Sequence, residues 1–502
     1  MKLSTLLETT EYTLVRGTLD REVKDLIYDS RKAGEDVMFV CISGFRVDAH
    51  AFLADVALNG AAAVVMEKNW CDLSEVTRRT LVEKGVTVLQ VADTRRALAT
   101  LSAAWFGYPT KKMTVVGFTG TKGKTTSTHM LVSILKAAGR TPGLIGTNGV
   151  KYLDKFFPTR NTTPESYELQ YHAANMLAEG VDCLVMEVSS QGLKLHRVDG
   201  IDFDYGVFLN LSPDHIGGDE HPDFEDYRDS KTMLFTRCRE GILFKDDENF
   251  PAMAMRASCS VTSYGFDETA DIRISAVRYD RQDDTLGCQV RLEGAETLEY
   301  FVGMPGLFNV YNATSAAVIA LKMGIGADEI RRGLASARVD GRMEVVTGSE
   351  DFSVIVDYAH NGVSARTLLE TLRSYKPSRL IVVFGCGGNR DPHRRYEMGE
   401  AVGRFADLSI VTSDNSRYEK VEDIIRDIHL GLDPTGGAFR DIPDRREAIR
   451  YAVLNARKGD MIAVIGKGHE DYQEIAGVRQ HFLDREEIEA ALAMRKAGAQ
   501  EG

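Results

Sequence analysis

The sequence predicts an α/β protein with three domains. The chain has 502 residues, which is too long for a single hydrophobic core. Short apolar runs alternate with amphipathic helical patterns along most of its length, and this alternation indicates mainly parallel sheets covered by helices on both faces. Breaks in the pattern divide the chain into three expected domains, at residues 1–108, 109–338 and 339–502.

The first domain is expected to be a small α/β sheet. Apolar runs at 37–42, 61–66 and 86–91 read as buried strands, and helical patterns separate them. The sequence FGYPTKK at 106–112 then interrupts the pattern, and Pro109 makes this segment a plausible linker.

The second domain opens with a buried strand at 113–118 and continues as strand–helix units, with further strands at 183–188 and 205–211. Between 271 and 302 the apolar residues alternate with a period of two, which predicts an antiparallel excursion from the sheet. Two helical patterns, NVYNATSAAVIALKMG and ADEIRRGLASAR, complete this domain.

The third domain resumes the strand–helix alternation after VDGRME at 339–344. Its strands are VIVDYAH, LIVVFGCGG, LSIVTSD and MIAVIGKG, and each is followed by a helical pattern. A doubly wound sheet of this kind binds ligands beyond the carboxyl ends of its strands. We therefore expect the functional residues at the strand ends.

Charge and composition exclude several classes of function. The net charge of -13 disfavours a protein that binds nucleic acid or an anionic membrane surface. Glu8 and Glu11 interrupt the apolar run that a signal peptide would need, and no stretch of 18 apolar residues predicts a membrane span. The seven cysteines are scattered without a CxxC pair, so we expect reduced thiols in a cytoplasmic protein.

A phosphate-binding loop follows the strand at 113–118. Glycines allow the backbone N–H groups to point at phosphate oxygens, and the following helix adds its dipole. Lys124 is expected to reach the β- and γ-phosphates of ATP, and the Thr125 hydroxyl to bind Mg²⁺. Phe118 stands where the usual pattern has its first glycine, so the loop is a variant. Its expected nucleotide-binding residues are Gly120, Thr121, Lys122, Gly123, Lys124, Thr125 and Thr126.

Three further residues are candidates for the chemistry beside this loop. Glu187 ends the strand at 183–188, where a phosphate-loop protein places a second Mg²⁺ contact. His215 follows the next strand, and Lys231 lies on a helical pattern. Taken alone, His215 is more often a loop histidine, and Lys231 a solvated helix lysine.

The order of motifs changes this interpretation. T-G-T-x-G-K-T-T, N-T-T-P, E-V-S-S, N-L-S-x-D-H, a helical lysine, G-x-F-N-V-Y-N, G-R-M-E, D-Y-A-H and G-K-G-H-E-D-Y-Q follow one another over about 360 residues. The chain resembles the Mur ligases, and most of all those that add the third residue to UDP-N-acetylmuramoyl-L-alanyl-D-glutamate. The resemblance implies a UDP-sugar domain, a central ATPase and a C-terminal Rossmann-like domain for the amino acid.

The resemblance also implies a reaction. The substrate carboxylate attacks the γ-phosphate of ATP to give an acyl phosphate, and an amine then displaces phosphate through a tetrahedral intermediate. Mg²⁺ and Lys124 must offset the repulsion between two anions in the first step. The family would use Glu187, His215 and a carbamylated Lys231 as Mg²⁺ ligands beside Thr125.

Other residues match the family's binding positions. Those expected to contact the UDP-muramoyl dipeptide are Ser30, Asn161, Thr162, Thr163, Ser189 and Arg197; those near the nucleotide are Asn309, Arg342 and His360. Two departures affect this set. Gly217 ends D-H-I-G where the family usually has D-H-L-D, and Leu195 replaces a frequent glutamine.

The third domain should select the added amino acid. Asp414, Asn415, Ser416 and Arg417 resemble the D-N-P-R motif of the enzymes that add meso-diaminopimelate, with serine in place of proline. A guanidinium at Arg417 would bind a carboxylate and repel the ammonium of lysine. Arg390, Gly466 and Glu470 match further family contacts. The bland alternative makes Arg417 a surface arginine that caps the helix or pairs with Glu419.

Several alternatives stay open. The amino acid could be lysine or another diamino acid, and the protein could be a divergent paralogue acting on a modified substrate. A folylpolyglutamate-synthetase-type ligase shares the central domain, but it would not be expected to carry D-S-R at 29–31 or D-N-S-R at 414–417. A phosphate-loop switch or motor would need coupling surfaces, and no coiled coil, repeat or basic groove is visible. We expect a monomer that binds UDP-N-acetylmuramoyl-dipeptide and a free diamino acid, without nucleic acid or membrane.

Overall fold

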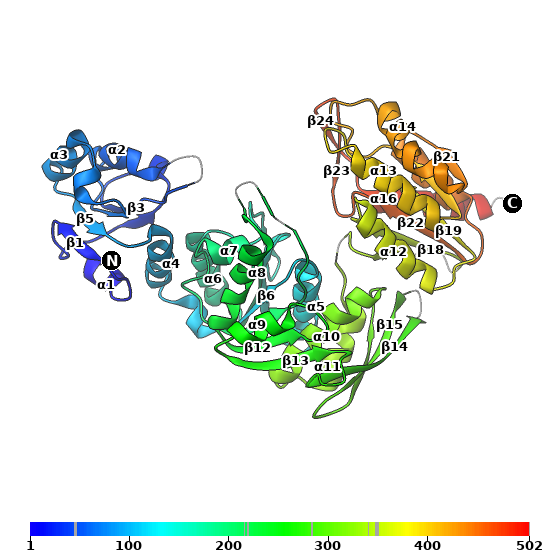
Figure 1. Ribbon diagram of the computed structural model, residues 1–502, viewed down its shortest axis with the longest axis horizontal. Coiled ribbons are helices and arrows are strands. Elements are labelled where there is room, and N and C mark those ends of the chain that lie inside the picture. Colours follow the sequence, from blue (N-terminus) through cyan, green and yellow to red (C-terminus); the bar gives the residue numbers. More distant parts are fainter. Residues whose placement is uncertain are drawn as a thin grey trace. The chain divides into compact units, whose positions relative to one another are not determined.

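A computed structural model of the chain describes residues 1–44, 48–214, 216–217, 220–282, 285–339, 341–346 and 351–500 (Figure 1). The chain divides into two compact units. The first comprises residues 1–272 and 315–324, and the second residues 273–314 and 325–502. This grouping does not test the three expected domain boundaries, which stay predictions.

The N-terminal part of the first unit is a five-stranded sheet in the order β1-β5-β4-β3-β2. Strand β1 is antiparallel to β5, and the other neighbours are parallel. Buried apolar side chains form one cluster on each face, as alternation of strands and helices predicts. The elements are α1 (Leu3–Leu6), β1 (Thr13–Arg16), β2 (Asp25–Ile27), β3 (Val37–Val40), α2 (Leu53–Leu58), β4 (Ala63–Met66), α3 (Glu75–Glu83), β5 (Thr87–Gln90) and α4 (Thr94–Trp105).

The rest of the first unit holds a second, mainly parallel sheet, in the order β13-β12-β11-β6-β10-β7-β8-β9. Strands β8 and β9 form an antiparallel hairpin beside β7. Because β6, β10 and β11 are neighbouring parallel strands, their carboxyl ends meet at one edge of the sheet. The strands are β6 (Thr114–Thr119), β7 (Pro142–Gly146), β8 (Gly149–Tyr152), β9 (Lys155–Phe157), β10 (Cys183–Glu187), β11 (Phe203–Phe208), β12 (Cys238–Phe244) and β13 (Ser260–Gly265).

The helices of this second sheet follow its strands in the predicted alternation. They are α5 (Lys124–Ala137), α6 (Ser166–Ala178), α7 (Ser190–Lys194), α8 (Phe224–Thr232) and α9 (Phe250–Arg256). Helix α5 begins directly after the phosphate loop, and α7 begins three residues after the end of β10. Both helices therefore start at the edge of the sheet where the functional residues were expected.

The period-two segment forms the predicted antiparallel strands. They are β14 (Ile272–Gln282), β15 (Thr285–Glu293) and β16 (Leu298–Val302), paired in this order. Two helices follow, α10 (Leu307–Lys322) and α11 (Ala327–Ser336).

The second unit contains a six-stranded sheet in the order β17-β18-β22-β19-β20-β21. Only β17 is antiparallel to its neighbour. Helices α12, α13 and α14 pack against one face and α15 and α16 against the other, so the doubly wound prediction is confirmed. The strands are β17 (Glu344–Val346), β18 (Ser353–Asp357), β19 (Arg379–Phe384), β20 (Leu408–Val411), β21 (Phe439–Asp441) and β22 (Asp460–Ile465).

The helices of this sheet are α12 (Gly362–Ser374), α13 (His393–Phe405), α14 (Val421–Leu432), α15 (Arg445–Leu454) and α16 (Asp484–Gln500). A two-stranded hairpin, β23 (Tyr472–Ile475) and β24 (Val478–His481), follows β22.

Within the described residues, none of the helices combines the length and the apolar character that crossing a membrane requires.

Candidate active site

The phosphate loop joins β6 to α5, as the sequence predicts. Gly123 precedes the helix with φ of +87°, a left-handed conformation that favours glycine. The Lys124 ammonium donates to the carbonyl oxygens of Gly120 at 2.8 Å and Thr121 at 3.2 Å. Asn210, two residues after the end of β11, is hydrogen-bonded to the loop, because its side-chain oxygen accepts from the Lys122 N–H at 2.9 Å. Lys124 is thus folded over its own loop, where a phosphate would be its natural partner.

Glu187 lies at the end of β10, next to β6, and only 1% of its surface is exposed. One carboxylate oxygen accepts from the Thr125 hydroxyl at 3.0 Å and the Thr147 N–H at 2.9 Å, and the other accepts from the Thr147 hydroxyl at 3.2 Å. Burial raises the pKa of Glu187, although Lys124 and these hydrogen bonds oppose the rise. A buried carboxylate that contacts the threonine of a phosphate loop fits a divalent cation.

Gly146, at the end of β7, makes this arrangement possible. A Cβ at this position would lie 2.3 Å from Oε1 of Glu187. The backbone of β7 therefore lies so close to the Glu187 carboxylate that any side chain at position 146 would displace it.

Lys231 is also buried, with 1% of its surface exposed. Its ammonium donates to the carbonyl oxygen of Gly120 at 3.0 Å and lies 4.6 Å from the centre of the Tyr227 ring. Burial, and then the nearby charge of Lys124, lower the pKa of Lys231 well below its usual value. Burial also lowers the pKa of Lys124. A lysine amine held in its neutral form is a nucleophile and can be modified by an electrophile.

The remaining predicted metal ligand, His215, lies outside the described residues, so its role stays a prediction. Within the described part of the chain, no group of three or more His, Cys, Asp and Glu side chains is arranged to hold a metal ion. The donors that the structure brings together are the Thr125 hydroxyl and the Glu187 carboxylate. Lys231, which is a cation or a neutral amine unless modified, lies across the loop from them.

Most of the residues predicted to bind the muramoyl substrate in this unit surround the end of β10. The Thr163 hydroxyl donates to the carbonyl oxygen of Glu187 at 3.0 Å and accepts from the Ser189 N–H at 2.9 Å. The Thr162 hydroxyl is 3.0 Å from that of Thr147. The Arg197 guanidinium donates to the carbonyl oxygen of Thr163 at 3.0 Å. The predicted set is therefore continuous with the phosphate loop through Glu187.

The other predicted binding residues lie elsewhere. Asn161 is exposed beside Thr162, and Ser30 begins a short 3₁₀ helix after β2 in the N-terminal sheet. In the second unit, Asn309 is buried near the start of α10. Arg342 and His360 both pack on the Tyr358 ring, the guanidinium at 4.8 Å and the imidazole edge-on at 4.8 Å. The nucleotide contacts assigned to Asn309, Arg342 and His360 stay predictions.

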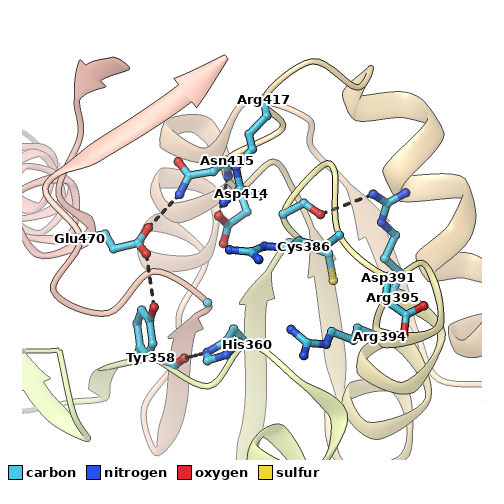
Figure 2. Close-up of a pocket in the computed structure, with 14 residues that line it drawn as sticks. Tyr358, His360, Cys386, Asp391, Arg394, Arg395, Asp414, Asn415, Arg417 and Glu470 are labelled. Atoms are coloured by element: carbon cyan, nitrogen blue, oxygen red, sulfur yellow. Dashed lines mark hydrogen bonds between the residues drawn. The ribbon is translucent and has the colours of Figure 1, made fainter. Parts of the chain in front are cut away.

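The second unit contains a pocket of about 190 Å³ at the carboxyl ends of its strands (Figure 2). Its lining is strongly charged and carries both signs. The pocket includes six of the seven residues predicted to contact the amino acid, and Ser416 is not among its lining residues. The lining is Tyr358, His360, Gly385, Cys386, Gly387, Arg390, Asp391, Arg394, Arg395, Asp414, Asn415, Arg417, Gly466 and Glu470.

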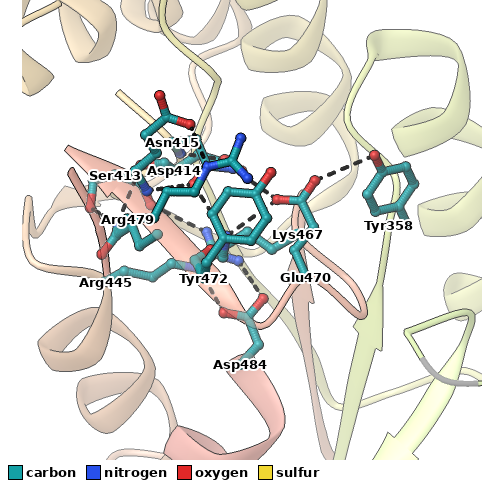
Figure 3. A network of polar contacts seen from close by, with 12 residues as sticks. Tyr358, Ser413, Asp414, Asn415, Arg445, Lys467, Glu470, Tyr472, Arg479 and Asp484 are labelled. Carbon is teal, nitrogen blue, oxygen red and sulfur yellow. Dashed lines mark hydrogen bonds and ion pairs between the residues drawn. The ribbon is translucent and has the colours of Figure 1, made fainter. Parts of the chain in front are cut away.

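Hydrogen bonds connect the residues of this pocket (Figure 3). The Asn415 amide donates to Glu470 at 2.8 Å, and the fully buried Lys467 ammonium lies 3.3 Å from the same carboxylate oxygen. The Glu474 N–H, on β23, donates to the Asn415 side-chain oxygen at 2.8 Å. Gly466 has φ of +116°, and a Cβ there would lie 2.7 Å from Oδ2 of Asp414. The carboxylates at one end of the pocket are thus held in fixed positions.

Arg417 also lines the pocket, and its guanidinium donates to the carbonyl oxygen of Gly388. Glu419 pairs instead with Arg395, at 2.8 Å. Arg395 is buried and also contacts Asp427 at 2.7 Å. The alternative in which Arg417 pairs with Glu419 is therefore wrong, and the substrate contact of Arg417 stays a prediction.

Sequence reasoning missed Arg394, Arg395, Tyr358 and Lys467 at this site. Arg394 and Arg395 are adjacent at the start of α13, and nothing in the sequence distinguishes the buried arginine from the exposed one. Lys467 lies within G-K-G-H-E, and its place between Gly466 and Glu470 was the signal that could have identified it.

A buried ion pair lies behind the pocket (Figure 3). Arg445 and Asp484 have 0% exposed side chains, and two guanidinium nitrogens each lie 2.7 Å from a carboxylate oxygen. Arg445 also donates to the carbonyl oxygens of Ile465 at 3.1 Å and Ser413 at 3.4 Å. It thereby joins the ends of β22 and β20, which carry Gly466 and Asp414.

Comparison with known proteins adds independent findings. Residues 118–320 match the Mur ligase middle domain, and residues 341–468 match the Mur ligase glutamate ligase domain. The UDP-N-acetylmuramoyl-L-alanyl-D-glutamate–2,6-diaminopimelate ligase of Caldanaerobacter subterraneus subsp. tengcongensis is 39% identical over 494 residues, which cover 98% of this chain and 99% of that protein. The ligase of the same name from Clostridium perfringens is 37% identical, with 97% and 99% covered. A solved structure of a ligase of this name has a TM-score of 0.77 and 27% identity, with 99% of both chains covered.

Proposed function

The chain belongs to the Mur ligase family, and from this premise we propose that it adds meso-2,6-diaminopimelate to UDP-N-acetylmuramoyl-L-alanyl-D-glutamate at the expense of ATP. The observation that carries this proposal is the charged pocket of the second unit, which gathers Arg390, Asp414, Asn415, Arg417 and Glu470. A diaminopimelate molecule carries two ammonium and two carboxylate groups, so it needs partners of both signs.

The phosphate loop prepares the first step. Lys124 exchanges the carbonyl oxygens of its own loop for the β- and γ-phosphates of ATP, and the N-terminus of α5 adds its dipole. The muramoyl carboxylate then attacks the γ-phosphorus of ATP, and the bond between this phosphorus and the β–γ bridging oxygen breaks. ADP is released, and the muramoyl substrate becomes an acyl phosphate. Thr125, Glu187, His215 and a carbamylated Lys231 would hold Mg²⁺, and the cation would supply positive charge beside the phosphates.

Lys231 is suited to carbamylation. Carbon dioxide reacts with the neutral form of an amine, and burial favours that form at Lys231. The new N–C bond releases a proton and converts the side chain into an anion. This change gives Lys124 an anionic neighbour at Gly120 and creates an oxygen ligand for a hard cation.

The pocket supplies the amine for the second step. Arg417 and Arg390 bind carboxylates of the incoming amino acid, while Asp414 and Glu470 bind an ammonium group. The reacting amine loses its proton and attacks the acyl carbon; the tetrahedral intermediate then expels phosphate and leaves an amide. Lysine keeps the distal ammonium group of diaminopimelate but lacks the carboxylate on the same carbon, so it would leave Arg417 without an anionic partner and bring a cation close to it.

An amino-acid panel tests the proposal. The purified protein is given UDP-N-acetylmuramoyl-L-alanyl-D-glutamate, Mg·ATP and one of diaminopimelate, L-lysine, L-ornithine or L-glutamate. ADP and product mass are both measured. We expect ADP together with an amide product only when acceptor and diaminopimelate are both present, and no product from the Lys124→Ala variant.

Other results would favour the alternatives. A lysine product would identify a lysine-adding ligase, and extension of a folate by glutamate would identify a folylpolyglutamate-synthetase activity. Phosphate release without acceptor or amine would favour a switch. If diaminopimelate and the muramoyl dipeptide never give an amide, the proposed function is wrong.

We further propose that the enzyme acts as a monomer in the cytoplasm, on soluble substrates and without nucleic acid or membrane. The net charge of -13 supports the last two points, because both partners are anionic.

A further inference from the structure

His221 is a fully buried histidine that the proposed mechanism does not use. Its exposed fraction is 0%, and it lies in the acidic segment before α8. Unlike a histidine that only fills space, it has a polar partner at each ring nitrogen. Nδ1 lies 2.6 Å from Oδ2 of Asp226, and Nε2 lies 2.9 Å from the Ser190 hydroxyl.

The Asp226 carboxylate orients the ring of His221. Burial would raise the pKa of Asp226, but hydrogen bonds from Lys194 and His221 outweigh that effect and lower it. The carboxylate is therefore ionised and accepts the Nδ1–H of His221. In the tautomer that carries its proton on Nδ1, Nε2 accepts the Ser190 O–H.

These two bonds join the elements that carry the reaction's charged groups. Ser190 is the first residue of α7 and follows Glu187 by three residues, at the end of β10. Asp226 lies on α8, five residues before Lys231. Lys194, at the end of α7, reaches the same Asp226 oxygen at 2.7 Å. His221 and Lys194 therefore hold α7 and α8 together through one carboxylate.

A third contact extends from His221 to the phosphate loop. The imidazole packs edge-on against the Tyr227 ring, with 5.2 Å between ring centres. The Tyr227 hydroxyl is hydrogen-bonded to the Thr121 hydroxyl at 3.1 Å, and the Lys231 ammonium lies over the same ring. A change in the position of His221 would thus reach both Thr121 and Lys231.

We propose that His221 is a positioning residue for the ligation reaction. Through Ser190, Asp226 and Tyr227 it fixes the distance between Glu187 and Lys231, two of the described residues proposed to bind the cation beside the phosphate loop. His221 itself touches no reacting atom. The inference rests on the proposed function, because it assigns a purpose to the position of Lys231.

Two substitutions test the inference. His221→Asn keeps a donor near Asp226 but loses the bond to Ser190, and Ser190→Ala removes the same bond from the other side. We expect kcat to fall by about 10–100-fold in His221→Asn, the range found for groups that orient metal ligands. The KM for diaminopimelate should stay within about two-fold of the wild-type value, because the amino-acid pocket lies in the other unit. The kcat of the double variant should be no lower than that of His221→Asn alone, because both changes remove the same hydrogen bond between His221 and Ser190.

A second readout separates positioning from simple loss of stability. A displaced Lys231 should hold its carbamate less well, so added bicarbonate should raise the activity of His221→Asn and leave that of the wild type unchanged. The matched control is His50→Asn, which disturbs another buried histidine that is bonded to an aspartate, Asp48, at 2.6 Å. That control should lower the melting temperature without changing kcat or the bicarbonate response.

The outcomes are distinct. A kcat within two-fold of wild type in the folded His221→Asn and Ser190→Ala proteins would overturn the inference. The inference would also be overturned if kcat fell in His221→Asn, bicarbonate did not restore it, and His50→Asn showed the same loss. If His221→Asn does not fold, Ser190→Ala alone decides, and we expect a loss of at least about three-fold in kcat with the same bicarbonate response. Absence of ligation in the wild type would instead remove the proposed function.

Discussion

At the scale of single residues, two lysines donate to one acceptor, the carbonyl oxygen of Gly120. Lys124 and Lys231 both donate to this atom, at 2.8 and 3.0 Å, and Lys231 is buried while Lys124 is partly buried. An ammonium group at Lys231 would be repelled by the charge of Lys124, and this repulsion adds to burial in lowering the pKa of Lys231. Modification of Lys231 to an anion relieves the repulsion, and so does the arrival of phosphate.

Lys231→Ala should therefore lose about 100-fold or more in kcat, because the site loses an anionic metal ligand. A small carboxylate such as acetate or formate should restore part of the activity by occupying the vacated space. Steady-state ADP release with increasing carboxylate checks this expectation. Unchanged activity without any carboxylate would remove the carbamate from the mechanism.

Arg417→Lys should raise the KM for diaminopimelate by about 10–100-fold, the value of one charge-assisted hydrogen-bonded pair. The KM for ATP should hardly change, because the phosphate loop lies in the other unit. Initial rates with each substrate varied in turn provide the measurement. Equal increases in both KM values would mean that the arginine supports the fold and does not select the substrate.

The residues that the sequence could predict are those embedded in motifs at strand ends. Lys124, Thr125 and Glu187 lie together at the phosphate loop, as expected. Asp414, Arg417 and Glu470 lie together around the pocket of the second unit. Burial was harder to predict, because a helical Lys231 reads like a solvated lysine. His221 and Arg395 act through side chains distant in sequence, and a single sequence without its fold does not show such partners.

At the scale of elements, the close approach of β7 to β10 sets the position of Glu187. This approach depends on Gly146, which ends β7 directly beside the carboxylate. The neighbouring Gly143 lies in the same strand, but a Cβ there would meet the flexible end of Met176 at 2.5 Å. The two glycines therefore differ in what their replacement would displace.

Gly146→Ala should lower kcat by about 10-fold or more and destabilise the protein by about 1–3 kcal/mol, the usual cost of overpacking. Gly143→Ala is the matched control, and we expect it to keep most of the activity because the Met176 side chain can move. Thermal unfolding and ADP release together check the pair. Equal activity in both variants would show that the position of Glu187 tolerates displacement.

Helix α14 and strand β21 are connected by His429, which lies 2.7 Å from Asp433 and 3.0 Å from Asp441. Burial lowers the pKa of His429, but the two aspartates outweigh it and raise the pKa. The folded protein therefore holds this proton more tightly than the unfolded chain. The resulting stabilisation is complete below the unfolded pKa of about 6.5 and is lost as the pH rises through the higher folded pKa.

His429→Gln should thus be less stable than the wild type at about pH 5.5, and the difference should vanish by about pH 9. Urea unfolding at a series of pH values measures the difference directly. A constant difference across this range would mean that His429 contributes by packing and not through its charge.

Periodicity predicted most elements because buried strands and amphipathic helices have clear repeats. The strands at 113–118 and 183–188 and the antiparallel strands between 271 and 302 are confirmed. The hairpins β8–β9 and β23–β24 were not predicted, because their strands have three or four residues each and are too short to show a clear repeat, although β8 is mostly buried. Helix α7 is similarly short, and its importance appears only through Ser190 and Lys194.

At the scale of the whole molecule, the chain has two compact units. The first contains two mainly parallel sheets and the second contains one, and each unit has its own cluster of functional residues. The expectation of an α/β fold is confirmed. The length of the chain and the interruptions in its pattern could predict several domains. They could not fix the boundaries, because α10 contributes residues to both units. Contacts between distant segments decide such a division.

The protein is expected to behave as a monomer of 55.5 kDa. Its net charge of -13 opposes self-association at low ionic strength. Light scattering coupled to size-exclusion chromatography, at low and high salt, gives the mass. A stable dimer that persists on dilution would contradict the expectation.

The charged lining of the second pocket has a consequence for the design of inhibitors. Drug-sized molecules gain most of their affinity from apolar surface, and typical sites for them are larger and mostly apolar. Here a compound must offer paired cations and anions and give up their hydration before it binds. The same groups would hinder its passage through a lipid bilayer. Medicinal chemistry aimed at this enzyme should therefore begin from compounds that enter cells on amino-acid carriers.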